Sequence, residues 1–151
     1  MDTVTYPDRG VAEFIERHFL PVRLVVKQEP DLVEEYLVHW TPNVVLADGD
    51  GRLPYRIEGY LPPTEFLARL ALGLGKYWLH TQQFDLAGEH FEEVARRHAG
   101  TEAGAEALYW LGVAAYKHKH DSGALRHEWR RLEADYPSSE WTRRTQIPRA
   151  R

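Results

Sequence analysis

Polar and apolar positions near the N-terminus follow helical spacing. The apolar positions recur three or four residues apart with charged residues between them: Val11, Phe14, Ile15, His18 and Phe19. Such spacing places them on one face, which predicts a helix over residues 11–18. Pro21 ends this helix because proline cannot continue it. A second, shorter helix is predicted over residues 31–36, where Pro30 suits the first helical turn.

Three short runs have the pattern of strands. Residues 22–26 are rich in β-branched side chains and residues 44–47 are similarly apolar, so each run predicts a strand. Asp48-Gly49-Asp50-Gly51 then predicts a hairpin turn, because glycine and aspartate tolerate the positive φ angles of such turns. The returning strand is expected over residues 53–58, with Pro54 placing its start at an edge.

The second half of the chain has a purely helical pattern that repeats. Helices are predicted over residues 64–80, 84–98, 102–119 and 123–135, followed by a capping turn over residues 139–145. The repeat has an offset of 37 residues, and its matching positions are Leu74-Gly75 with Leu111-Gly112, and Ala87 with Ala124. Small side chains at these positions allow antiparallel helices to cross closely.

This repeat, together with the late Tyr136-Pro137, resembles the tetratricopeptide family. Two repeats are fewer than the ~3 that an independent solenoid needs, so we expect the helices to pack on the preceding sheet as one composite domain. The resemblance implies a partner surface, with the candidate residues Tyr77, His80, Tyr109 and Tyr116. The expected parts are residues 1–63, 64–137 and a capping turn with a basic tail at 138–151.

The order of the N-terminal elements, over about residues 6–72, resembles the thioredoxin-like family downstream of its active-site helix. Trp40-Thr41-Pro42 looks like the segment in which that family has its cis-proline, so a cis Thr41–Pro42 bond is implied. In that family the backbone before this proline pairs with an extended peptide. Trp40, Thr41 and Pro42 are therefore the candidate peptide-binding residues, and the alternative is that Trp40 is a core aromatic residue.

Cysteine is absent from all 151 residues. Thiol–disulfide exchange requires a thiolate, so the chain as given is not expected to be an oxidoreductase. The resemblance also implies a missing upstream strand, the central one between the counterparts of residues 22–26 and 44–47. Its loss would leave two ladders unpaired, at roughly 1–3 kcal/mol for each unsatisfied buried group.

Three outcomes are open for this gap. The two flanking strands could pair directly, another chain could supply the strand, or the reading frame could be truncated. The predicted fold class is α/β followed by all-α, with an incomplete thioredoxin-like sheet of about three strands packed against a two-repeat helical bundle. The predicted function is a non-catalytic protein-interaction module. The alternatives are a C-terminal fragment of a disulfide oxidoreductase with its Cys-x-x-Cys upstream of Met1, and an oligomeric structural module.

Net charge and the clusters of titratable residues limit the kinds of partner and ligand that we expect. The net charge of −4 divides into −5 over residues 1–62, −2 over 63–137 and +3 over 138–151, which argues against nucleic acid. No apolar run approaches the ~18 residues of a membrane span and no signal peptide is visible, so a cytoplasmic protein is expected. His118 and His120 point about 200° apart on a helix. We predict no metal, cofactor or catalytic residue, and a protein or peptide partner, including a second copy joined at strand edges.

Overall fold

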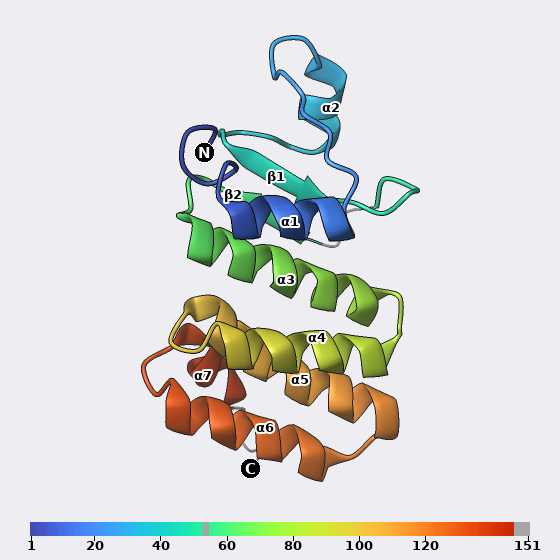
Figure 1. Cartoon of the computed structure of the whole chain (residues 1–151). Coiled ribbons are helices and arrows are strands. Elements are labelled where there is room, and N and C mark those ends of the chain that lie inside the picture. Colours follow the sequence, from blue (N-terminus) through green and yellow to red (C-terminus); the bar gives the residue numbers. More distant parts are fainter. Residues whose placement is uncertain (53–54, 147–151) are drawn as a thin grey trace. The chain divides into compact units, whose positions relative to one another are not determined.

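The computed structural model describes residues 1–52 and 55–146. The chain divides into two compact units, Met1–Leu67 and Ala68–Arg151. The first unit holds α1 (Arg9–His18), α2 (Pro30–Glu35), β1 (Asn43–Leu46), β2 (Tyr55–Glu58) and the start of α3 (Pro63–His80). The second holds the rest of α3, followed by α4 (Phe84–Arg97), α5 (Glu102–Lys119), α6 (Ser122–Asp135) and α7 (Glu140–Thr145) (Figure 1).

The sheet of the first unit is the antiparallel hairpin β1–β2. Val44 lies opposite Ile57, and Leu46 lies opposite Tyr55. The Asp48 N–H donates to the Arg52 carbonyl over 3.0 Å, and Gly51 has a φ of 77°, which a residue with a side chain rarely adopts. The predicted Asp-Gly turn is therefore confirmed, while Leu53 and Pro54 lie outside the described residues.

The strand predicted over residues 22–26 is wrong. These residues lie in the connection between α1 and α2, outside any helix or strand, and all five are exposed (Figure 1). The sheet in the described part of the chain has two strands rather than about three. A β-prone run forms a strand only when a neighbour satisfies its backbone groups, and residues 22–26 do not pair with β1.

Two side chains hold the end of α2 on the hairpin. Arg56 of β2 donates to the carbonyl of Tyr36 and, over 3.2 Å, to that of Leu37. Leu37 itself has a φ of 49°, so the chain turns sharply after α2. The Tyr36 hydroxyl donates to the Gly51 carbonyl over 3.3 Å. These contacts order the segment that leads into Trp40.

The second unit consists of helices in antiparallel succession, with bounds within a residue or so of the predicted ones (Figure 1). Polar side chains cap three of them: Thr101 at α5, Asp121 at α6 and Ser139 at α7. Each accepts a hydrogen bond from a backbone N–H of the first turn, which has no partner within the helix. The expected capping turn near the C-terminus is thus a short helix, α7.

Two glycines permit the close helix crossings that the repeat predicted. A Cβ at Gly75 would lie 2.6 Å from the Phe91 ring, and one at Gly112 would lie 2.9 Å from the Trp129 ring. Phe91 and Ala87 are fully buried on α4. Close approach at these positions is therefore a property of the structure, whereas the assignment to tetratricopeptide-like packing stays a prediction.

Candidate functional site

The free edge of β1 is the strongest candidate for a binding site. The sheet of the described residues contains β1 and β2 alone, so one edge of β1 has no strand beside it. Gly59 N–H donates to the Pro42 carbonyl over 2.8 Å. Because hydrogen-bonded and non-hydrogen-bonded pairs alternate in an antiparallel ladder, Asn43 and Val45 direct their backbone groups to the free edge.

The segment before β1 exposes a large aromatic side chain. Trp40 is 69% exposed, so the alternative in which it is a core aromatic residue is wrong. Thr41 is also exposed and Pro42 is half-buried. The Thr41–Pro42 peptide bond is cis. The three candidate residues therefore lie directly before β1 in the chain, and Trp40 is accessible to a ligand.

Asn43 makes the edge polar at its start. Its Nδ2 donates to Glu58 Oε1 over 3.4 Å, across the hairpin. Its Oδ1 is buried without a hydrogen-bond partner, and so is Nε of Arg56. Unpaired buried polar atoms weaken the local structure unless water or a ligand satisfies them. Both atoms belong to the two strands that form the candidate site.

Elsewhere in this unit, Tyr6 packs edge-on against Phe66, with ring centroids 5.7 Å apart. Burial, together with the charge of Asp2, raises the pKa of Tyr6, while Arg23 lowers it by a smaller amount. Thr5 Oγ1 donates to the Leu61 carbonyl over 2.7 Å. These contacts attach the N-terminal residues to the start of α3, and none of them involves a residue of the candidate site.

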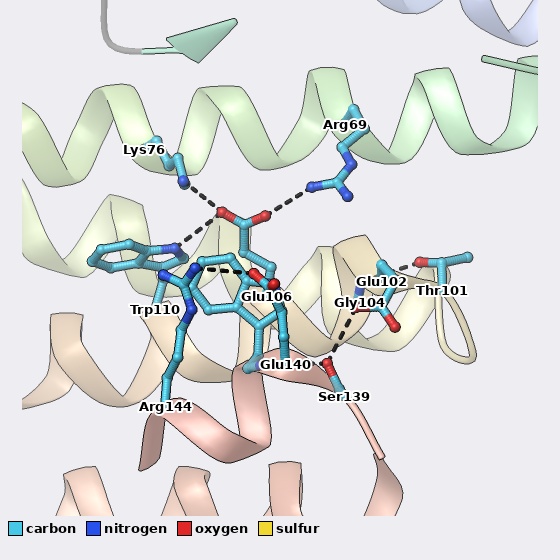
Figure 2. Close-up of polar contacts among 11 residues, drawn as sticks. Arg69, Lys76, Thr101, Glu102, Gly104, Glu106, Trp110, Ser139, Glu140 and Arg144 are labelled. Atoms are coloured by element: carbon cyan, nitrogen blue, oxygen red, sulfur yellow. Dashed lines mark hydrogen bonds and ion pairs between the residues drawn. The ribbon is translucent and has the colours of Figure 1, made fainter. Parts of the chain in front are cut away.

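The helical unit contains a second polar cluster, centred on Glu106 of α5 (Figure 2). The Glu106 side chain is 4% exposed, and Arg69 Nη1 lies 2.7 Å from its Oε2. Lys76 Nζ lies 2.5 Å from the other oxygen, Oε1, which also accepts from Trp110 Nε1 over 3.2 Å. Two cations and a neutral donor therefore surround one buried carboxylate.

Aromatic rings surround this cluster. Lys76 Nζ lies 5.0 Å from the centre of the Trp110 ring, and the Arg144 guanidinium lies 4.5 Å from that of Trp141. A surface pocket of about 500 Å³ adjoins the cluster, lined by Arg69, Glu102, Glu106, Ser138, Glu140, Trp141 and Arg143. Because Glu106 is already satisfied by its protein partners, we expect the arrangement to stabilise the helical unit. Sequence analysis missed Glu106, although a lone carboxylate in the small apolar run Ala103-Gly104-Ala105-Glu106-Ala107 signals a buried charge.

The four residues expected to form a partner surface differ in their surroundings. Tyr109 is half-buried, stacks on Trp129 with centroids 5.1 Å apart and lies 5.3 Å from Trp141. Tyr77 is half-buried against Trp78, whereas His80 is exposed and Tyr116 is 41% exposed. Tyr109 therefore takes part in aromatic packing within the helical unit, and the role of the four residues as a partner surface stays a prediction.

Two further groups in the helical unit have shifted pKa values. Burial, with a smaller contribution from Arg97, lowers the pKa of His98. Hydrogen bonds to Glu92 and Glu128 raise the pKa of Arg131, which links α4 to α6. In the described residues, no group of His, Asp or Glu has the arrangement of a metal site, and no helix is long and apolar enough to cross a membrane.

Comparison with known proteins found a match for the N-terminal part of the chain. Residues 2–73 match the family model of a thioredoxin-like domain, which confirms this part of the resemblance. No curated protein and no solved structure matched the chain. Residues 2–73 are thus similar to a thioredoxin-like domain but contain no cysteine, and the candidate site is the β1 edge that follows the cis-proline.

Proposed function

We propose that the chain is a protein-interaction module that binds an extended polypeptide along the free edge of β1 and does no thiol chemistry. The observation that carries this proposal is Trp40, 69% exposed beside the cis Thr41–Pro42 bond and the unpaired edge. Edge addition gives affinity through main-chain hydrogen bonds, and neighbouring side chains give specificity. An exposed tryptophan is a typical anchor of such an interface.

The absence of cysteine supports the non-catalytic part of the proposal. Without a thiolate there is no nucleophile for disulfide exchange. We therefore expect no reduction of insulin disulfides by the purified chain above that of a heat-denatured sample. Turnover above this control would contradict the non-catalytic assignment.

Peptide binding is tested with a fluorescein-labelled octapeptide of alternating valine and threonine. A second peptide with the same sequence and N-methyl groups on alternate amides serves as control, because it cannot donate a full ladder. We expect rising anisotropy with the first peptide only. Equal binding of both peptides would show that the backbone is not recognised.

Substitution distinguishes the two candidate surfaces. Trp40→Ala is expected to weaken peptide binding about tenfold, the effect of truncating an interface anchor. Tyr116→Ala removes another exposed aromatic side chain, from the helical unit, and is expected to leave the affinity unchanged. If Tyr116→Ala weakened binding and Trp40→Ala did not, the binding surface would lie on the helices.

A further inference from the structure

The first unit contains both a free strand edge and a β-prone segment that has no strand partner. The segment is residues 20–28, Leu-Pro-Val-Arg-Leu-Val-Val-Lys-Gln. Its Leu20 is 95% exposed, Val22 is 78% exposed, and Leu24, Val25 and Val26 are between 42% and 50% exposed. Exposed β-prone runs and free edges are the two features that natural proteins usually avoid, because they pair with other chains. Each chain therefore holds a donor and an acceptor that it does not join itself.

We infer that the occupant of the β1 edge is residues 22–26 of a second copy of this chain. The inference rests on the proposed function, because it names what that edge binds. Two copies exchange the segments reciprocally: residues 22–26 of each copy lie along β1 of the other. This is a closed interface with two-fold symmetry, in which residues 22–26 and the β1 edge of each copy are both paired.

Charge favours a second copy over an unrelated partner. Residues 20–28 carry Arg23 and Lys27 and no acidic residue, a net charge of +2. The remaining residues of Met1–Leu67 carry four Arg against twelve Asp and Glu, a net charge of −8. Asp48 and Asp50 lie in the turn that follows β1. The basic segment of one copy thus lies against the acidic first unit of the other. This charge complementarity favours association and favours pairing of the segment with β1 of the other copy.

The segment is also released at little expense within its own chain. Arg23 forms an ion pair with Asp2 at 2.8 Å, but the two side chains are 81% and 58% exposed. Exposed pairs contribute little to stability, so their exchange for partners in the other copy is easy. Within this run the backbone forms a turn, in which Gln28 N–H donates to the Val25 carbonyl over 2.8 Å.

Sedimentation velocity of the full chain tests the inference first. We expect a species of twice the 17.5 kDa chain mass, whose dissociation constant rises with salt. Leu24→Pro removes a backbone donor at an exposed position and is expected to weaken dimerisation about tenfold or more. Leu24→Ser loses the same apolar side chain but keeps the N–H, so it is expected to weaken dimerisation less. Equal effects of the two variants would contradict strand pairing.

Cross-linking then identifies the pairing, since a chain without cysteine gives no background. Chains carrying Val25→Cys and chains carrying Val45→Cys are mixed and oxidised mildly. We expect disulfide-linked dimers from the mixture and almost none from either variant alone. Linked dimers from Val45→Cys alone would show edge-to-edge pairing of the two β1 strands and overturn the inference.

The failures of the inference and of the proposed function are distinguishable. A monomeric wild-type chain that binds the valine–threonine octapeptide would overturn the second copy as occupant and keep the edge as a binding site. A monomeric chain that does not bind the octapeptide would overturn both the second copy as occupant and the β1 edge as a binding site. Circular dichroism of each variant confirms that the helical content is unchanged, which is expected because Leu24 and Val25 are half exposed.

Discussion

Glu106→Gln tests whether the buried charge cluster stabilises the helical unit. The change keeps the shape of the side chain and an oxygen that can accept from Trp110 Nε1, which lies 3.2 Å away. It removes the negative charge that faces Arg69 at 2.7 Å and Lys76 at 2.5 Å. Arg69 and Lys76 then lose the carboxylate that they share.

The size of the loss follows from burial. Removing one partner of a fully buried ion pair costs about 3–5 kcal/mol, mainly because the other charge stays desolvated. Here the Arg69 and Lys76 side chains keep 30% and 21% of their exposure, so water recovers part of the loss. We therefore expect Glu106→Gln to lower the free energy of unfolding by about 2–4 kcal/mol.

The assay is urea unfolding of the full chain, followed by tryptophan fluorescence and by circular dichroism at 222 nm. The matched control is Glu140→Gln, because Glu140 pairs with Arg144 at 3.0 Å while both side chains are more than half exposed. Such a pair contributes about 0–1 kcal/mol. If Glu106→Gln shifted the midpoint no more than Glu140→Gln, the cluster would not stabilise the fold and the reasoning from burial would be refuted.

Two other substitutions test the packing and the titration of the helical unit. Gly75→Ala would place a Cβ 2.6 Å from the fully buried Phe91 ring and is expected to destabilise the chain by about 1–3 kcal/mol in thermal unfolding. The control is Gly88→Ala, whose Cβ would lie 3.9 Å from Leu111 and which is expected to stabilise the helix by about 0.5–1 kcal/mol. Equal effects of the two variants would contradict the close crossing. The lowered pKa of His98 means that the unfolded chain binds its proton more readily than the folded chain, so stability from this group falls as pH drops below about 6.5. His98→Gln is expected to flatten the stability curve in that range, and an unchanged slope would contradict the assignment.

The sequence predicted the helices well because their local signals agree with their packing. Thr101, Asp121 and Ser139 stand at the starts of α5, α6 and α7 and cap them in the structure. Gly75 and Gly112 were expected at close crossings, and both face aromatic rings there. Caps and small residues act over one or two turns, so a single sequence is sufficient to find them.

The conformation of residues 22–26 could not be predicted in the same way, and the strand expected there does not form. Residues 22–26 and β1 have similar β-branched content, yet only β1 has a neighbour, β2, that it reaches through a short turn. Strand formation depends on a partner that composition does not specify. The cluster around Glu106 was missed for a related reason. Its partner Arg69 is 37 residues away in the sequence, and only the tertiary fold brings the two side chains together.

The distribution of exposed apolar side chains supports placing the proposed binding site in the first unit. Nine of the eleven large hydrophobic side chains exposed in the described residues belong to Met1–Leu67, and two, Leu86 and Tyr116, belong to the helices. Apolar surface that is left in water is unfavourable by about 25 cal/mol per Å², so a unit that exposes this much gains more from association than one that has buried it. The helical unit, by contrast, satisfies Glu106 internally and packs Tyr109 between two tryptophans. A partner of this chain should therefore protect the amides of residues 22–28 and 43–46 from hydrogen exchange more strongly than those of α4 and α6. Protection confined to the helices would show that the interface lies on the helical unit and would contradict our proposal.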